Sequence, residues 1–352
     1  MTTTINGVKA FAPGRVNFIG EHTDYNGGLV MPAALNLGVT VTASKLSEPV
    51  LKIRSIDFNK TGSFPIAELK RDDSESWANC PKGMTAVLNE IKPFSCGCEV
   101  TITGNIPLGS GLSSSAACEV AVGKALCTLF GIELTPMELA LAAQQAEHRF
   151  TGTLCGIMDQ AASALGKKDC LIKLDCAKLE WEYVPFKLNG VKLLITNTGV
   201  KHNLADGEYN KRRKECSEAL NVIKTVLPDM RDLASCSPDW IRKNKSLFQE
   251  VVYKRALHAS TEQDRVLKAS AALAAGELAE TGRLMTASHR SLQNDYEVSC
   301  EELDWLVDNA LSISGVYGAR MTGGGFGGCM IALLDESSVE LYRKSMAGYK
   351  EK

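Results

Sequence analysis

The chain lacks the features of several broad protein classes. None of its apolar runs approaches the roughly 20 residues that a membrane-spanning helix requires, so no membrane association is expected. The net charge of −2 at pH 7 provides no basic surface for nucleic acid. Its N-terminus has neither a long apolar stretch nor a clear cleavage site, so no signal peptide is expected and the predicted location is the cytoplasm.

The 12 cysteines lack the spacing of a zinc site. Cys96 and Cys98 form one close pair, and no second pair stands at zinc-finger spacing. Scattered thiols in a long chain are typical of a reduced cytoplasmic protein. We therefore expect free, mostly buried cysteines.

The common nucleotide-binding patterns are also missing. There is no G-x-x-x-x-G-K-[ST] segment, and no G-x-G-x-x-G is followed by the expected acidic residue. Instead, an alternating strand pattern at 100–103 leads into a loop rich in glycine and serine, and helical spacing follows to about residue 129. Such a loop can direct backbone N–H groups and a helix N-terminus at phosphate, although a serine-capped turn is the alternative. The candidate phosphate-binding residues are Gly109, Ser110, Gly111, Leu112, Ser113, Ser114 and Ser115.

A second polar stretch lies between apolar segments near the N-terminus. Residues 13–28 read PGRVNFIGEHTDYNGG and have no periodic apolar face, which predicts a loop. Its consecutive polar residues either form a solvated turn or bind neighbouring hydroxyls of a sugar. Arg15 either lies at the surface or offers a permanent cation to a phosphate. The candidate sugar-binding residues of this loop are Glu21, His22, Thr23 and Asp24.

Three further features indicate a ligand site. Residues 323–328 include five glycines, which favours close packing against a ligand or another loop over a flexible segment. Asp159 has small and apolar neighbours, so its charge calls for a partner such as an arginine, unless it is simply an acid near a helix N-terminus. Glu147 is a candidate metal ligand, or an exposed helical glutamate.

Local signals place several other elements. Thr135, Pro136 and Glu138 predict a capping box that starts a helix ending near Gly152. Further helical stretches are expected at about 203–226 and 249–285, and strands at 39–43, 191–196 and 330–334. Gly131 is expected to end the helix that follows the glycine- and serine-rich loop and runs to about residue 129. A weakly marked boundary near 167–185 divides the chain into predicted domains 1–175 and 176–352.

Together these motifs resemble the galactokinases of the GHMP kinase superfamily. Three superfamily motifs are present, at residues 13–28, 107–117 and 318–329, and the first is similar to the galactokinase signature itself. Further similarity lies at 77–83, 145–148 and 155–160, and at Tyr209. The resemblance therefore covers almost the whole chain.

The resemblance implies an α+β fold of two domains with the active site in the cleft between them. The N-terminal domain would be like the second domain of ribosomal protein S5, and the C-terminal domain would be ferredoxin-like. The implied activity is that of an ATP-dependent sugar 1-kinase, which transfers the γ-phosphoryl group of ATP to the anomeric C1 hydroxyl of galactose in galactose metabolism. Mg²⁺ would be the cofactor, and a monomer or weak homodimer is expected.

The resemblance also implies residue roles. Arg15 would contact the transferring phosphoryl group, and Asp159 would face the C1 hydroxyl. The loop from Gly109 to Ser115 would wrap the ATP phosphates, and Ser115 with Glu147 would hold Mg²⁺. The other implied contacts are Glu21, His22, Thr23, Asp24, Gly156 and Tyr209 for the sugar, and Ser55 and Trp77 for the nucleotide.

Two positions depart from the family pattern. Ala161 stands where many relatives have phenylalanine, and Cys80 where many have tyrosine. The choice of sugar therefore stays open, with N-acetylgalactosamine and arabinose as alternatives to galactose. A non-catalytic sugar sensor and a kinase for mevalonate or homoserine are further alternatives. The catalytic set argues against the sensor, and the polar run at 21–24 argues against an apolar acid as substrate.

Overall fold

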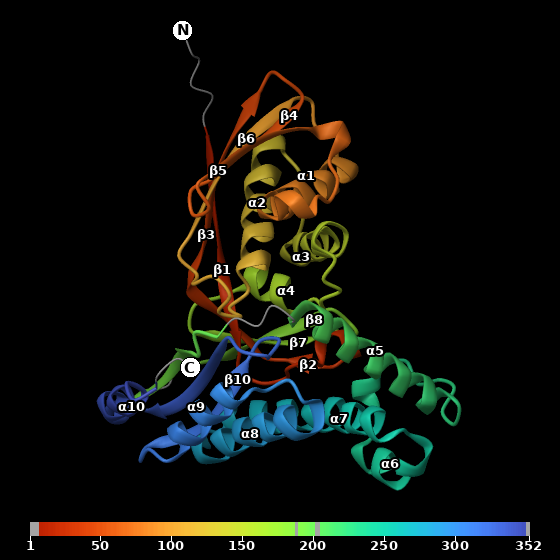
Figure 1. Ribbon diagram of the computed structural model, residues 1–352, viewed down its shortest axis with the longest axis vertical. Helices are drawn as coiled ribbons and strands as arrows, with labels where there is room; N and C mark the ends of the chain where they lie inside the picture. Colours follow the sequence, from red (N-terminus) through yellow and green to blue (C-terminus); the bar gives the residue numbers. More distant parts are fainter. Residues whose placement is uncertain (1–6, 187–188, 201–204, 350–352) are drawn as a thin grey trace. The chain divides into compact units, whose positions relative to one another are not determined.

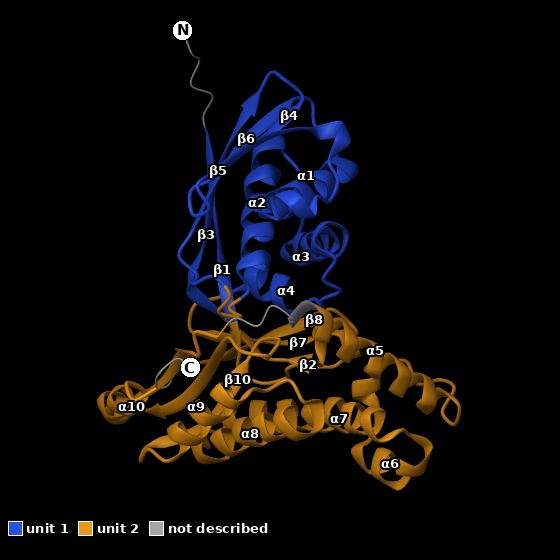
Figure 2. Cartoon of the chain, in the orientation of Figure 1, with its two compact units in different colours: residues 1–15, 34–108, 113–166 blue, residues 16–33, 109–112, 167–352 orange. Residues whose placement is uncertain are grey.

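The computed structural model describes residues 7–186, 189–200 and 205–349, and these residues form a mixed α+β structure (Figure 1). Its contacts divide the chain into two units (Figure 2): unit 1 contains residues 1–15, 34–108 and 113–166, and unit 2 contains 16–33, 109–112 and 167–352. The expected domains were two contiguous halves, 1–175 and 176–352. The two units are each discontinuous in sequence, because two short segments of the N-terminal half contact the glycine-rich loop at 323–328.

Unit 1 contains a five-stranded sheet with the order β1-β3-β6-β4-β5. β3 and β6 pair antiparallel, with Val39 opposite Gly104 and Ala43 opposite Val100, which confirms the strands expected at 39–43 and 100–103. β1 runs to Asn17, so the loop expected at 13–28 begins only after that residue. The strands are β1 (Val8–Asn17), β3 (Pro32–Leu46), β4 (Val50–Ser55), β5 (Lys60–Pro65) and β6 (Gly97–Gly104).

The helices of unit 1 pack against one another, with α2 alongside the sheet (Figure 1). α2 ends at Gly131 in the left-handed region (φ 63°), as expected. The capping box at Thr135 and Glu138 is present, and the helix that it starts continues through a π-helical turn to Gly152. The helices are α1 (Asn79–Ile91), α2 (Ser114–Phe130), α3 (Pro136–Ala146), the turn η4 (Glu147–Thr151) and α4 (Met158–Leu165), with 3₁₀ turns at Ile66–Glu68 and Asp73–Ala78.

Unit 2 contains two three-stranded sheets, with the orders β10-β11-β9 and β2-β7-β8. All the pairings in these two sheets are antiparallel. The strands expected at 191–196 and 330–334 are confirmed as β9 and β11. The strands are β2 (Leu29–Val30), β7 (Cys170–Asp175), β8 (Glu180–Pro185), β9 (Val191–Asn197), β10 (Val316–Thr322) and β11 (Cys329–Asp335).

One helical stretch expected in unit 2 is divided. The pattern at 249–285 predicted continuous helix, but α7 and α8 are separate because Gly276 takes a left-handed conformation (φ 74°) between them. The two helices pack together (Figure 1). The helix predicted at about 203–226 was expected to start at Asn203, which lies outside the described residues. The helices are α5 (Ala205–Lys224), α6 (Pro238–Lys243), α7 (Glu250–Ala274), α8 (Leu278–Ser291), α9 (Glu301–Leu311) and α10 (Val339–Met346), with short turns at Asp24–Asn26, Leu233–Ser235, Lys245–Leu247, Leu292–Tyr296 and Glu336–Ser338.

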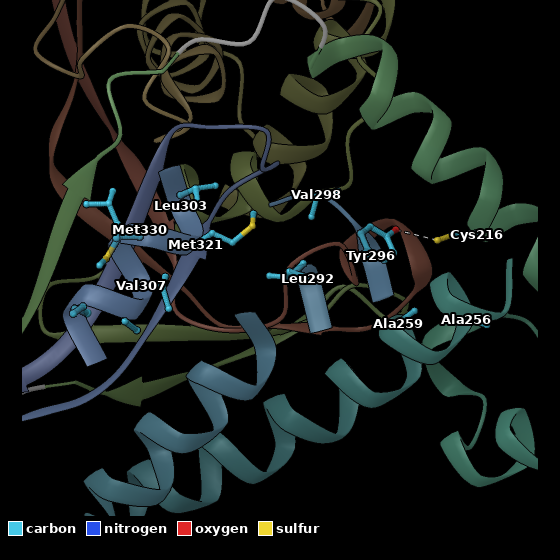
Figure 3. Packing of buried hydrophobic residues seen from close by; sticks show 14 of the residues in the cluster. Cys216, Ala256, Ala259, Leu292, Tyr296, Val298, Leu303, Val307, Met321 and Met330 are labelled. Atoms are coloured by element: carbon cyan, nitrogen blue, oxygen red, sulfur yellow. Dashed lines mark hydrogen bonds between the residues drawn. The ribbon is translucent and has the colours of Figure 1, made fainter. Parts of the chain in front are cut away.

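The core of unit 2 contains a large apolar cluster. Figure 3 shows Leu303, Val307, Met321 and Met330 packed together, with the Tyr296 ring at the edge of this set. All twelve cysteines are free; four are buried and eight are half-buried, so fewer are buried than expected. No helix within the described ranges is long and apolar enough to cross a membrane.

The contact between α8 and β10 leaves no space for a side chain at Gly282. A Cβ atom there would lie 2.1 Å from the carbonyl oxygen of Tyr317. We expect Gly282→Ala to lower the free energy of unfolding by about 1–3 kcal/mol, because backbone must move to admit the methyl group. In the matched change Gly207→Ala, on α5, nothing lies within 4 Å of the added Cβ. This control should gain about 0.5–1 kcal/mol. Urea unfolding measures both, and equal effects would contradict the close approach.

Candidate functional site

A buried ion pair joins two of the predicted residues within unit 1. Nε and Nη2 of Arg15 donate to Oδ1 and Oδ2 of Asp159, each at 2.8 Å. Arg15 lies near the end of β1 and is 4% exposed, whereas Asp159 lies in the first turn of α4 and is 27% exposed. The arginine partner expected for Asp159 is thus confirmed. The two-point contact fixes the plane of the carboxylate while leaving part of it accessible.

Ser113 is the third member of this group. Its Oγ donates to Oδ2 of Asp159 at 2.5 Å. Ser113 precedes α2 in the left-handed region with φ 59°, a conformation that costs a non-glycine residue about 1–3 kcal/mol. The sequence placed this serine in a phosphate loop and did not predict its contact with Asp159, because the spacing of 46 residues carries no signal for it.

A cavity of about 780 Å³ in unit 1 brings together four of the nine residues predicted for the nucleotide. Ser55, Trp77, Ser114 and Ser115 all line it. Much of the remaining wall is apolar, and small-molecule sites are commonly apolar with a few polar groups. The other lining residues include Val39, Ile102, Ile106, Leu108, Cys80 and Cys118.

Glu147 has the features of a cation ligand. It is 6% exposed and begins the π-helical turn, where Thr151 Oγ1 donates to its Oε1 at 2.9 Å. Oε2 is buried without an N–H or alcohol donor from the described residues, and the carboxyl of Glu119 hydrogen-bonds with the Glu147 side chain. Burial, and then Glu147, raise the pKa of Glu119 well above its usual value.

The residues around Glu147 fit Mg²⁺. No group of three or more His, Cys, Asp or Glu residues that could hold a metal occurs in the described part of the chain. Mg²⁺ does not need such a group, because it is commonly bound by one or two carboxylates together with substrate phosphates. Ser115 and Thr151, whose hydroxyl donates to Glu147, line the same cavity, whereas Glu147 is not among its lining residues.

In unit 2, Glu21 connects the first and third motifs. It is 1% exposed, and its Oε2 accepts from Nδ2 of Asn17 at 3.0 Å. Its Oε1 accepts from the backbone N–H of Gly323 at 2.7 Å and lies 3.5 Å from Nη1 of Arg320. The buried carboxylate is therefore held by a positive partner and two donors.

His22 lies against aromatic side chains. Its ring centroid is 4.7 Å from that of Tyr296 and 5.7 Å from that of Tyr209, and its Nδ1 is 2.7 Å from the hydroxyl of Tyr25. Burial, followed by the nearby His258, lowers the pKa of His22 to about 3. The imidazole is therefore neutral at physiological pH. Two of the residues predicted for the sugar, His22 and Tyr209, are thus brought together within unit 2.

The other predicted sugar residues differ in their surroundings. Thr23 is fully buried, and its hydroxyl faces the carbonyl oxygens of Gly20 at 2.8 Å and Leu29 at 2.7 Å, so it closes the loop. Asp24 is half-buried at the start of a 3₁₀ turn in the same unit. Gly156 belongs to unit 1, where it is buried just before α4.

The phosphate loop is divided between the two units. Residues 113–115 belong to unit 1, whereas 109–112 belong to unit 2. In unit 2, a Cβ on Gly323 (φ 90°) would lie 2.8 Å from the carbonyl oxygen of Gly111. The third motif therefore packs closely against another loop, which is one of the two reasons expected for its glycines.

Sequence reasoning missed the residues that support this site. Asn17 and Tyr25 lie inside the first motif, but the sequence assigned no role to them. Arg320 lies inside the third motif and Tyr296 outside all three, and neither contact could be predicted because the partners are about 270–300 positions away in the sequence.

Buried histidines make the stability of the fold depend on pH, and the pKa of His22, His258 and His289 is lowered in each case mainly by burial. Burial is the largest cause that lowers the pKa of His22 to about 3 and of His258 to about 4, from an ordinary 6.5. The unfolded chain takes up protons below pH 6.5 and the folded chain does not, so stability is complete above that pH and falls below it. We expect a loss of about 2 kcal/mol for each of His22 and His258 at pH 5.

Urea unfolding at pH 7.5 and pH 5 measures this loss. The variant His258→Gln should show a weaker pH dependence than the parent chain, because one of the buried histidines is gone. An unchanged dependence in the variant would show that other groups are responsible.

Three segments of the chain match known families. Residues 4–45 match the galactokinase galactose-binding signature, 79–167 the GHMP kinase N-terminal domain, and 269–349 the GHMP kinase C-terminal domain. These segments include Arg15, Glu147 and Asp159.

Similar proteins span nearly the whole chain. A galactokinase of Staphylococcus carnosus is 44% identical over 98% of this chain and 90% of its own length. A galactokinase of Actinobacillus pleuropneumoniae is 42% identical over 97% of this chain and 89% of its own.

Solved structures agree with these matches. The structure of Lactococcus lactis galactokinase complexed with galactose has a TM-score of 0.94 at 41% identity, covering 97% of this chain and 88% of that one. The mevalonate kinase of Methanococcus jannaschii, at 19% identity, shares the fold with a TM-score of 0.68, covering 99% of this chain and 96% of its own. The expected two-domain GHMP kinase fold is confirmed, and the chain belongs to the galactokinase family of GHMP kinases.

Proposed function

We propose that this chain transfers the γ-phosphoryl group of ATP to the anomeric C1 hydroxyl of galactose, giving galactose 1-phosphate and ADP. The observation that carries this proposal is the Arg15–Asp159 pair, in a chain whose residues 4–45 match the galactose-binding signature. A carboxylate held by an arginine and a serine is suited to accept a hydroxyl proton beside a charged phosphoryl group.

In this mechanism, Asp159 orients the C1 hydroxyl and takes its proton. Arg15 holds the carboxylate in place and stabilises the negative charge on the transferring group. Ser113 fixes Oδ2 of Asp159. Phosphoryl transfer asks a protein mainly for such positioning and charge stabilisation.

The nucleotide is assigned to the cavity of unit 1 and to the phosphate loop. Ser55 and Trp77 would line the base, and the loop from Gly109 to Ser115 would donate backbone N–H groups to the phosphates. Ser115 and Glu147 would hold Mg²⁺, supported by the burial of the Glu147 carboxylate. A bound Mg²⁺ neutralises charge on the ATP phosphates.

Five of the predicted sugar residues keep their proposed role. They are Glu21, His22, Asp24, Gly156 and Tyr209. We assign Thr23 to holding the loop closed, because its hydroxyl faces two backbone carbonyls inside that loop. A cytoplasmic location and a monomeric or weakly dimeric state stay predictions.

The retained catalytic set favours a kinase over a sugar sensor. The deciding measurement is ADP release from Mg-ATP with a panel of galactose, N-acetylgalactosamine, arabinose, glucose and mevalonate. We expect the highest kcat/KM with galactose. A clear preference for another sugar would change the substrate assigned, and binding of galactose without ADP release would indicate a sensor.

The variant Asp159→Asn tests the catalytic assignment. Because an amide cannot take the proton, we expect kcat to fall by about 10²- to 10⁴-fold, with the KM for galactose within a few-fold of the parent value. The matched variant Asp175→Asn removes a charge from a carboxylate at the end of β7 and should keep parental kcat. Activity of Asp159→Asn within a few-fold of the parent would exclude an essential base.

The variant Glu147→Gln tests the metal assignment. We expect binding of Mn²⁺, used as a probe for Mg²⁺, to the ATP complex to weaken at least about tenfold by calorimetry. Glu138→Gln is the matched control, because this residue caps the same helix and its remaining side-chain oxygen can still accept from the Thr135 N–H. Equal metal affinity in the two variants would remove Glu147 from the proposed site.

A further inference from the structure

A chain of four side chains leads from the core of unit 2 to His22. Sγ of Cys216 lies 3.0 Å from the hydroxyl of Tyr296 (Figure 3), and that hydroxyl lies 2.8 Å from the hydroxyl of Tyr25. The Tyr25 hydroxyl in turn lies 2.7 Å from Nδ1 of His22. Cys216 and Tyr296 are both buried, at 2% and 0% exposure, so the inner links are closed to solvent.

The chemistry of these four groups decides which of them donates and which accepts in each hydrogen bond. An imidazole nitrogen is the strongest acceptor among them and a phenol is a good donor, so Tyr25 donates to Nδ1 of His22. A phenol has a single hydrogen, so the Tyr25 oxygen then accepts from Tyr296, whose oxygen accepts from the Cys216 thiol.

If every hydrogen bond in this series pointed the other way, the sulfur of Cys216 would have to accept two hydrogen bonds. Nδ2 of Asn26 already donates to Sγ of Cys216 at 3.5 Å. If His22 donated to Tyr25 and Tyr25 donated to Tyr296, the hydroxyl of Tyr296 would have to donate to the same sulfur. Because thioether and thiol sulfurs are weak acceptors, two donors at one sulfur are the poorer arrangement.

The direction of the chain decides which nitrogen of His22 carries hydrogen. With Nδ1 as an acceptor, a neutral ring must carry its hydrogen on Nε2. Nε2 is buried and has no hydrogen-bond partner among the described residues. The backbone of Gly324 interacts with the ring in the sense that raises its pKa, as a nearby carbonyl acceptor does. A carbonyl acceptor beside the ring is consistent with a hydrogen on Nε2.

We propose that Tyr25 and Tyr296 are positioning residues that fix His22 as the Nε2–H tautomer, which makes His22 a hydrogen-bond donor to a hydroxyl of the bound sugar. The inference rests on the proposed function, because it takes His22 as a residue that contacts galactose. The aromatic neighbours also restrict the ring, and His22 itself has a left-handed backbone with φ 63°. A donor held in one orientation and one tautomer discriminates against sugars that lack the matching oxygen.

Hydroxyl-deleting variants measure the contribution of each link. Tyr25→Phe removes the donor to Nδ1, and we expect it to raise the KM for galactose by about 3- to 10-fold. Tyr296→Phe keeps the ring stacked on His22 and should produce a smaller rise. In both, kcat and the KM for ATP should stay within about twofold of the parent. The double variant should be no worse than Tyr25→Phe, because both hydroxyls act through one hydrogen bond.

Tyr342→Phe is the matched control. Tyr342 belongs to the same hydrophobic cluster as Tyr296, is 3% exposed, and its hydroxyl is 2.6 Å from Oγ1 of Thr196. Its loss should leave the KM for galactose unchanged. A rise equal to that of Tyr296→Phe would mean that any buried hydroxyl matters, and would overturn the inference. If Tyr296→Phe does not fold, Tyr25→Phe decides the question alone, since it tests the link next to His22.

The tautomer is observable in the sugar-free protein. Two-bond ¹⁵N–¹H correlation spectra distinguish a protonated from a bare imidazole nitrogen, and the signals of His22 are those that disappear in His22→Gln. We expect a hydrogen on Nε2 and none on Nδ1 in the parent, and a mixture of tautomers in Tyr25→Phe. A hydrogen on Nδ1 in the parent would contradict the inference. Absence of galactose phosphorylation by the parent would instead defeat the proposed function, which the spectra do not test.

Discussion

The contact between Arg15 and Asp159 is the constraint around which unit 1 is arranged. An almost fully buried guanidinium needs a charged partner, because an unpaired charge at that depth is strongly destabilising. Satisfying it brings the end of β1 to the first turn of α4. The hydroxyl of Ser113 then has a carboxylate to donate to, which compensates the left-handed backbone before α2. The Arg15–Asp159 ion pair thus both holds β1 against α4 and positions the carboxylate that we propose as the proton acceptor.

Much of the fold could be predicted because its signals are local. A capping box at Thr135 and a glycine at 131 act on the turns beside them, and the structure has both. The break at Gly276 was missed because a single glycine is tolerated in many helices, and what ends α7 here is its left-handed conformation. The extension of β1 to Asn17 depends on pairing and burial, which the composition of a polar segment does not reveal.

The candidate site was predictable where a motif carried the residue. Glu21, Asp159 and Glu147 stand in recognisable runs, and each has buried contacts that give it a physical reason to be there. Their supports are different: Arg320 lies inside the third motif, but the motif does not reveal its contact with Glu21, and Tyr296 lies outside the three motifs. Tertiary packing selects such residues, and one sequence does not display that selection.

The carboxylate of Glu21 has a consequence for dividing or redesigning this protein. It is buried about 300 residues away in sequence from two of its partners, Arg320 and the Gly323 amide. A fragment that ends before β10 would leave this carboxylate without them, so the N-terminal loop cannot keep its native form in such a piece. For the same reason, replacing residues 20–28 with those of a relative also alters the contacts of Asn17 and of the segment at the end of β10. A replacement that keeps these contacts would have to exchange the loop together with Asn17 and the end of β10.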